Sequence, residues 1–444
     1  MFAYSNVIGF GLLSFIVLPG GSRAAENEIR DLLQAARGAA PALCVLAADG
    51  IARGNWGIAW EAPAVPVAAD VRRRVQRLRR DSLTADETTA LLAGLGSSDS
   101  CERHMSAILL GHSRKRSLAA DVARRLGSSA PDERAAALVA LGLMDATTET
   151  AAMARAVRDE SAVVRANAIW ALGQVEAKAE ASRIAAALRD REEMVRGAAA
   201  LSIGRLQHKE SVDILLQVLR NDESPEVRRV AAWALGQIED RRAAEGLTAA
   251  LRSDKSAEVR EMAGWALAEV GGRDAADAFI AALRDDQNEH VRFTSAWAIG
   301  NLHIRKGEEA LTNAVANDKD TDVRGIAAWA LGQMNLSRAP ANLVKALRDE
   351  SADVRLKAAW ALSQIGDPEV VKPVVEALRV EKVDRVRKAQ VRALIESGEH
   401  SDEVFRELLE SKDAETREVA VRALSGKRAN WPWPWPWPRP RPSP

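Results

Sequence analysis

This chain of 444 residues is poor in several residue types that mark particular chemistries. Aromatic residues make up 4% of it, there are two cysteines, and its 62 basic side chains are matched by 62 acidic ones. A net charge near zero gives no broad positive field, so we expect no nucleic-acid partner. Cys44 and Cys101 form no C-x-x-C pair. We interpret them as two separate buried thiols, and a single disulfide between them in an oxidising compartment is the alternative.

Sequence motifs for catalysis and metal binding are also missing. There is no H-E-x-x-H, G-x-S-x-G, Walker loop or Rossmann fingerprint, and no convincing strand on which such a loop would sit. Cys101 and His104 stand three residues apart, but two ligands without a matching second pair rarely make a metal site. We therefore predict no catalytic residue, no metal site and no cofactor.

What the chain has instead is a repeat. In each copy a marker arginine or its equivalent is followed, five residues later, by a position that is most often tryptophan. A fixed period of this size indicates stacked supersecondary units, each unable to bury its apolar face alone. The sequence therefore predicts an all-α fold, an α-solenoid of about 11 repeats. The equivalent positions, separated by 30 to 32 residues, are Ile108, Val139, Trp170, Leu201, Trp233, Trp265, Trp297, Trp329, Trp360, Arg392 and Arg422.

Each repeat has the pattern of two helices joined by a turn. Around Trp233, the apolar positions between 214 and 219 mark a first helix, Asn221–Pro225 the turn, and Glu226–Ile238 the second helix. In most repeats an aspartate of this turn stands six residues before an arginine, where a short carboxylate can accept backbone N–H groups and meet a guanidinium. These pairs are Asp159 and Arg165, Asp190 and Arg196, Asp222 and Arg228, Asp254 and Arg260, Asp286 and Arg292, Asp318 and Arg324, and Asp349 and Arg355.

The unit D-x-x-x-x-V-R-x-x-A-A-W-A-L-G-Q-I resembles the HEAT repeat, in the short form called the phycobilisome-lyase HEAT-like repeat. The resemblance implies a right-handed superhelix of helix pairs in which aspartate and arginine bond between neighbouring repeats as a ladder. This fold serves many functions, so the resemblance says little about activity. The matching residues around Trp233 are Asp222, Val227, Arg228, Ala231, Leu235 and Gly236.

The tryptophan lies away from the apolar stripe of its helix. At about 100° per residue from Val227, Trp233 falls near 240°, well off the stripe that Ala231 and Leu235 share with Val227. We expect the ring mainly to pack across the small Ala and Gly residues of the next repeat's second helix, with its edge still available to a ligand. Artificial repeat proteins of the resembled family vary the equivalents of Arg229, Val230 and Trp233 to make binders, which implies a concave surface for these positions.

Across the repeats these three positions define a candidate binding face. Apolar and aromatic groups dominate it, which is more typical of a protein or peptide interface than of a phosphate-binding groove. The candidate residues are Trp170, Arg229, Val230, Trp233, Met262, Trp265, Phe293, Trp297, Ile326, Trp329, Leu356 and Trp360.

Two segments precede the repeats. Residues 1–25 have the pattern of an export signal, with an apolar run at 7–18 that is too short to span a bilayer, followed by a small-x-small cleavage site. A wrongly assigned start codon and a remnant of a longer membrane segment are the alternatives. Residues 26–99 are expected to cap the array, with amphipathic helices at Glu26–Arg37 and Ala69–Arg80 and a Trp- and Pro-containing loop at Ile51–Pro66.

The repeats are predicted to cover 100–427, with Arg392 and Arg422 replacing tryptophan in the last two as expected for a polar cap. Residues 428–444 follow as a tail that contains Trp-Pro four times and Arg-Pro twice. Alternating proline favours a stiff polyproline II rod that can enter an aromatic-lined groove or contact a membrane interface. An inert low-complexity tail is the alternative.

From these features we predict a secreted or periplasmic, monomeric scaffold that binds a protein or peptide on its concave face without catalysis. A second hypothesis is an envelope-docking or sensor accessory protein that contacts a membrane or a membrane protein through its tail. A third is an enzyme, because bilin lyases share the repeat and the HEAT-repeat deoxyhypusine hydroxylases carry His-Glu dyads. Here the dyad occurs only in reversed order, at Glu289-His290 and Glu399-His400.

Overall fold

The computed structural model describes residues 28–38, 83–113 and 115–397, together with scattered residues between 406 and 421. Throughout these residues the regular elements are helices, as the all-α prediction requires. They fall into two compact units, one ending at Val175 and one beginning at Glu176. The α-helices of the first unit are α1 (Glu28–Ala36), α4 (Ala85–Gly94), α5 (Ser100–His112), α6 (Ala119–Ala123), α7 (Pro131–Leu143), α8 (Thr150–Ala156) and α9 (Ala162–Gln174).

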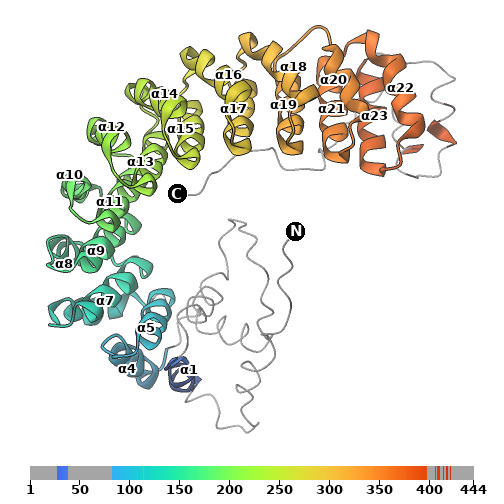
Figure 1. Ribbon diagram of the computed structural model, residues 1–444. Coiled ribbons are helices and arrows are strands. Elements are labelled where there is room, and N and C mark those ends of the chain that lie inside the picture. The colour runs from blue at the N-terminus through green and yellow to red at the C-terminus, as the bar shows by residue number, and fades with distance from the viewer. Residues whose placement is uncertain are drawn as a thin grey trace. The chain divides into compact units, whose positions relative to one another are not determined.

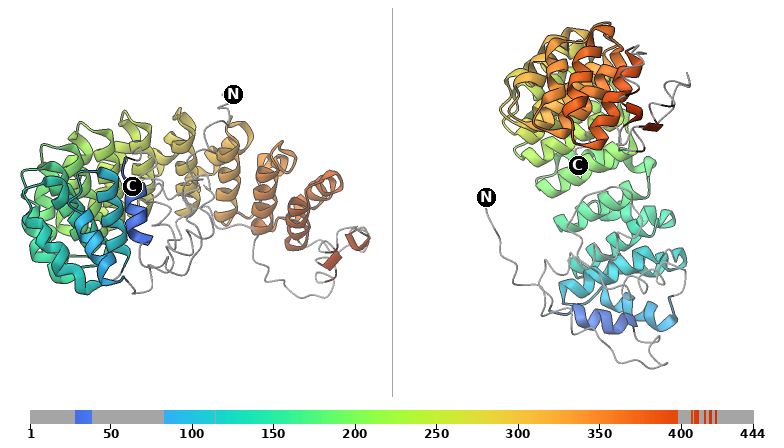
Figure 2. Two further views of the ribbon diagram at one scale, coloured as in Figure 1. Left: turned by 90° about the horizontal axis from the view of Figure 1, so that it is seen from below. Right: turned by 90° about the vertical axis from the view of Figure 1, so that its right-hand side faces the viewer.

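The second unit is a regular stack of helix pairs (Figures 1 and 2). Its second helices, α11 to α23 in odd numbers, pack against one another and against their own first helices. They form the inner row of this unit in Figure 1. The pairs are α10 (Ala181–Ala186) and α11 (Glu193–Leu206), α12 (Val212–Asn221) and α13 (Pro225–Ile238), α14 (Ala244–Ser253) and α15 (Ala257–Glu269), α16 (Ala276–Asp285) and α17 (Glu289–Asn301), α18 (Glu308–Asn317) and α19 (Thr321–Gln333), α20 (Ala341–Lys345) and α21 (Ala352–Ile365), and α22 (Val371–Val380) and α23 (Asp384–Glu396).

The repeat around Trp233 shows why each helix begins where it does. Helix α12 ends at Asn221, and the backbone of its C-cap residue Asp222 is extended. Ser224 then caps α13 by accepting a hydrogen bond from the Val227 N–H at 3.3 Å. Pro225 occupies the first turn, where its missing N–H has no partner to lose. The predicted turn and second helix are confirmed to within one residue.

In repeat after repeat, the second helix is followed within one or two residues by a residue whose backbone is in the left-handed region. Glycine occupies that place at Gly271 and Gly366, but six other residues adopt it with φ between 50° and 55°. A left-handed non-glycine residue costs about 1–2 kcal/mol, so the turn after the second helix lowers the free energy of unfolding of each of these repeats. The six are Asp145, Glu176, Gln207, Glu239, His303 and Asn335.

The apolar stripe of the second helix forms the core, as its spacing predicts. Val227, Ala231, Ala234 and Leu235 are each 0 or 1% exposed. Alanine at two of these four positions allows close approach of neighbouring helices, which lets a chain poor in aromatic residues build a dense interior.

Helix α1 covers the first hydrophobic face of the array. The predicted amphipathic helix is present at Glu28–Ala36, with Ile29 and Leu33 buried, and α1 contacts α4 and α5. Arg37 also forms a bidentate ion pair with Glu102 of α5 at 2.9 and 3.1 Å. These contacts are those expected of a cap. The predicted signal at 1–25, the loop at 51–66, the helix at 69–80, Arg422 and the tail at 428–444 lie outside the described residues.

Cys101 lies in α5 and is 3% exposed. It is disulfide-bonded, so our interpretation of it as a free buried thiol is wrong. Cys44, the other cysteine of the chain, lies outside the described residues. A disulfide constrains the unfolded chain and stabilises the fold by typically 2–4 kcal/mol.

Candidate binding surface

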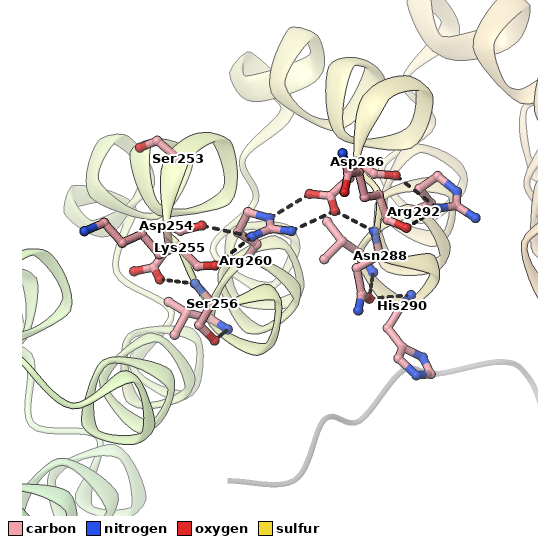
Figure 3. A network of polar contacts seen from close by, with 12 residues as sticks. Ser253, Asp254, Lys255, Ser256, Arg260, Asp286, Asn288, His290 and Arg292 are labelled. Atoms are coloured by element: carbon pink, nitrogen blue, oxygen red, sulfur yellow. Dashed lines mark hydrogen bonds and ion pairs between the residues drawn. The ribbon is translucent and has the colours of Figure 1, made fainter.

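The aspartates and arginines of the repeat form a ladder within each unit, and part of it is drawn in Figure 3. Arg260 reaches forward to the next repeat and donates from Nε and Nη2 to the Asp286 carboxylate at 2.7 and 2.9 Å. Its Nη1 donates to the carbonyl of Asp254, in its own turn, at 3.0 Å. Asp286 in turn accepts from the backbone N–H of Asn288 at 2.9 Å. One arginine thus fixes two successive turns relative to each other.

The same forward pairing recurs along both units. In each case the guanidinium and the carboxylate are mostly buried, so the pair is charge-assisted and poorly screened. The pairs are Arg134 with Asp159, Arg196 with Asp222, Arg228 with Asp254, Arg260 with Asp286, Arg292 with Asp318, Arg324 with Asp349, and Arg355 with Glu381.

Burial opposes ionisation of the ladder carboxylates Asp254 and Asp286, but the hydrogen bonds that these two groups accept outweigh it. For Asp254 and Asp286 the net result is a pKa below the ordinary value, because the bonds from Arg228 and Arg260 and from the backbone N–H groups favour the charged form. Asp254 and Asp286 are therefore ionised at neutral pH.

Two ladder members were not among our sequence candidates. Arg134 begins the series in α7, and Glu381 ends it by pairing with Arg355 at 2.7 Å. Glu381 stands six residues before Arg387, the spacing of the predicted pairs, but the predicted pattern contains only aspartate at this position. Arg165 and Asp190 fall in separate units. Within its own unit Arg165 donates to the carbonyl of Asp159 at 3.0 Å.

The tryptophans pack over glycines of the preceding repeat. A Cβ built on Gly236 would lie 2.7 Å from Cζ3 of Trp265 and 3.0 Å from both Cα and Cβ of Ala266. The same close approach joins Gly142 to Trp170, Gly204 to Trp233, Gly300 to Trp329 and Gly332 to Trp360. The ring therefore crosses the previous second helix and not the next one, so that detail of our prediction is wrong.

This packing buries most of the candidate binding face. Trp360 is 1% exposed and stacks on Trp329, with ring centroids 6.4 Å apart and planes at 13°. The low exposure of these rings favours packing as their main role, since a buried ring cannot contact a partner. The buried candidates are Val230, Met262, Trp265, Trp297, Ile326, Trp329, Leu356 and Trp360, and the half-buried ones are Trp170, Arg229, Trp233 and Phe293.

The ladder and the stacked helix pairs agree with the comparisons to known proteins. The family model of HEAT repeats matches residues 180–268, 244–312 and 308–395. This is a HEAT-repeat protein. No curated protein matches its sequence.

Three solved structures are similar to this HEAT-repeat protein. Kap95p in complex with RanGDP aligns with a TM-score of 0.57 and 13% identity, over 94% of this chain and 65% of Kap95p, and this likeness shows the solenoid fold. An engineered protein aligns with a TM-score of 0.46 and 19% identity, over 77% of this chain and 99% of that one. The complex of CpcE and CpcF of phycocyanin lyase from Nostoc sp. PCC7120 aligns with a TM-score of 0.33 and 20% identity, over 56% of this chain and 94% of that one.

The second helices of the HEAT repeats also have a side that is partly exposed to solvent. We call it the second-helix surface and define it, for α11 to α21, by the residues two before and one, five and nine after the ladder arginine. All six residues at the first of these positions are exposed: Met194, Glu226, Glu258, His290, Asp322 and Asp353. At the position five after the arginine, Leu201 and Trp233 are half-buried and the tryptophans from α15 to α21 are buried.

Helices α13 and α15 bring several charged groups together on this surface. Arg229 donates to Glu226 at 2.6 Å. Burial raises the pKa of Glu261 and the charge of Glu258 adds to the effect, although His290 and Arg229 oppose it. Farther along, burial lowers the pKa of Lys357. These shifts show that the surface is partly desolvated even without a partner.

Within the described residues, no group of three or more His, Cys, Asp and Glu side chains is placed to hold a metal ion. In the same part of the chain, no helix has the length and apolar character needed to cross a membrane. A cavity of about 530 Å³ lies at the ends of α11 and α13 and is lined by Gln207, His208, Lys209 and Glu239 among others. His208 there contacts Ser211 Oγ at 2.7 Å and Glu210 at 3.2 Å, but Ser211 is 1% exposed, so its hydroxyl does not face a substrate.

Proposed function

We propose that this HEAT-repeat protein is a scaffold that binds a protein or peptide along its second-helix surface, without a catalytic role. The supporting observation is that each second helix from α11 to α21 exposes the residue two before its ladder arginine, on a framework that the ladder and the Trp–Gly contacts hold in place. A preorganised surface loses little conformational entropy on binding. Kap95p, which has a similar fold, binds RanGDP, and this supports a protein as the class of partner.

A pull-down with surface variants tests the proposal. The full chain is immobilised and offered an envelope extract of its source cells. Replacing Met194, 53% exposed on α11, and half-buried Phe293 of α17 by serine should reduce recovery of a partner. The matched control is Val380→Ser, which removes a 68% exposed apolar side chain from the end of a first helix. Equal recovery by the surface variant and the control, both folded by circular dichroism, would reject the surface.

We also propose that the protein acts in the periplasm or outside the cell. The disulfide at Cys101 supports this location, because disulfides persist in oxidising compartments. The signal-like pattern of residues 1–25 supports it independently. N-terminal sequencing of the protein from fractionated cells should find it in the periplasm or medium and starting near Glu26. An uncleaved chain that begins at Met1 in the cytoplasm would contradict the proposal.

A second candidate function is docking to the cell envelope through the tail. The composition of the tail supports it, since tryptophan is favoured at membrane interfaces and arginine meets anionic headgroups. Deleting 430–444 should then release the protein from anionic vesicles. Unchanged vesicle association after the deletion would remove this candidate.

A further inference from the structure

The second-helix surface is open at α11, and it is apolar there except for the exposed Arg205 in the last turn of the helix. Met194 is 53% exposed and Leu201 is half-buried. Between them on the helix face stands Gly197, where an added Cβ would meet no atom within 4 Å. On the neighbouring helix α13, Trp233 is half-buried, whereas its equivalents from α15 to α21 are at most 6% exposed. A large apolar side chain therefore finds both space and apolar contacts here.

The next two helices present carboxylates. Glu226 and Glu258 are exposed on α13 and α15, and Glu261 is half-buried beside them. Glu261 makes no hydrogen bond or ion pair with the described residues, and burial already disfavours its charge. The facing groups from the packed helices are Arg229, which is held by Glu226 at 2.6 Å, and His290 of α17. One arginine does not balance three carboxylates.

On α21, acidic side chains have basic partners. Asp353 of α21 pairs with Arg385 of α23 at 2.6 Å. Lys357 is half-buried on α21, and Asp322 and Asp353 both favour its charged form. Unbalanced negative charge is therefore concentrated at α13 and α15, next to the apolar part at α11, in a chain whose total charge is zero.

We propose that the α11–α15 part of the second-helix surface binds an extended peptide segment with a large apolar side chain and, about six residues away, basic side chains. The apolar group lies on Met194, Gly197 and Leu201, and the basic groups meet Glu258 and Glu261. Packed helices are about 8–10 Å apart, so α11 and α15 are separated by roughly 16–20 Å. Six residues of a polyproline II segment span about 19 Å and return to the same side of the rod.

This inference deepens the proposed function, and it rests on the same surface being used. Opposite charge on the segment would supply specificity and speed association, while the apolar contact would supply most of the affinity. A basic group arriving at Glu261 also relieves the unfavourable burial of an unpaired carboxylate.

Three fluorescein-labelled, proline-rich peptides test the chemistry on the full chain by fluorescence anisotropy. The first carries tryptophan and, about six residues later, two arginines; the second has glutamate in place of the arginines; the third has alanine in place of the tryptophan. The first should bind at least about tenfold more tightly than either of the others, and its affinity should fall with salt. Equal affinity for the three, or no binding of the first, would overturn the proposal.

Variants of the protein locate the contact. The double variant Glu258→Gln/Glu261→Gln should weaken binding of the first peptide about tenfold and leave that of the glutamate peptide unchanged. Met194→Ser should weaken the first peptide but not the alanine peptide. The control Glu245→Gln/Glu308→Gln removes two exposed carboxylates from the first helices α14 and α18 and should change nothing. A further outcome is that the first peptide fails to bind while the serine variant of Met194 and Phe293 still loses its partner in the pull-down. That outcome would reject the proposed peptide chemistry and leave the proposed function standing.

Discussion

Replacing Gly236 by alanine tests whether the Trp–Gly contacts set the spacing of the repeats. The new methyl group would lie 2.7 Å from the Trp265 ring and 3.0 Å from both Cα and Cβ of Ala266. The ring is 6% exposed and enclosed, and one of the other contacts is backbone, so neither can move aside cheaply. Helices α13 and α15 must separate, which strains the contacts between them and also the pair between Arg228 and Asp254, which lies in the turn before α15.

The magnitude follows from two opposing effects. Alanine is favoured over glycine within a helix by about 0.5–1 kcal/mol. Overpacking a well-filled interface costs about 1–3 kcal/mol. Because both contact distances lie well inside van der Waals separation, we expect overpacking to dominate and the free energy of unfolding to fall by about 1–2 kcal/mol.

Urea denaturation followed by circular dichroism and tryptophan fluorescence measures the effect. Gly197→Ala is the matched control, because this glycine is also helical but an added Cβ there meets nothing within 4 Å. The control should raise the free energy of unfolding by about 0.5–1 kcal/mol. If Gly236→Ala is as stable as Gly197→Ala, the steric reasoning is refuted.

Further predictions concern the ladder, the rings and the disulfide. Arg260→Met leaves Asp286 unpaired and should cost about 2–4 kcal/mol, whereas Arg284→Met, in an exposed pair, should cost less than about 0.5 kcal/mol by urea denaturation. The pKa of Asp286 is lowered in the fold, so its stabilisation is complete above the unfolded-state pKa of about 3.9 and is lost as the pH falls below it. Wild type should therefore lose stability more steeply than Asp286→Asn in acid titrations followed by circular dichroism. Trp265→Ala should cost about 3–5 kcal/mol in urea, and a cost below about 1 kcal/mol would indicate a surface ring. Cys101→Ser should lower the free energy of unfolding by about 2–4 kcal/mol more without reductant than in dithiothreitol, where only the exchange of a buried thiol for a hydroxyl remains.

The helix pairs were predictable from sequence because period and polarity are local properties. The turn and second helix around Trp233, and the buried positions Ala231 and Leu235, follow from a 3.6-residue pattern within a single helix. The Asp and Arg spacing located the ladder residues, and the family resemblance supplied the pairing between repeats.

The role of the tryptophans was only partly predictable. A helical wheel for α13 places Trp233 off the stripe of its own helix but contains no information on the neighbouring repeats. The small residue that receives each ring stands about 29 residues earlier in the sequence, as Gly236 does for Trp265. The disulfide at Cys101 depends on contacts far apart in sequence, which neither spacing nor composition specifies.

The contacts between successive repeats of the second unit, which we call joints, are oriented in the same way at each repeat. This orientation determines what happens when the array gains or loses a repeat. At each one an arginine reaches forward and a tryptophan, where present, reaches back. Removing a whole repeat such as 239–270 brings Arg228 to Asp286 and Gly236 to Trp297, which recreates a joint of the same kind. Each repeat can therefore form the same contacts with any other repeat of this kind. We expect duplication or loss of one repeat to leave a chain that still folds, with a longer or shorter second-helix surface.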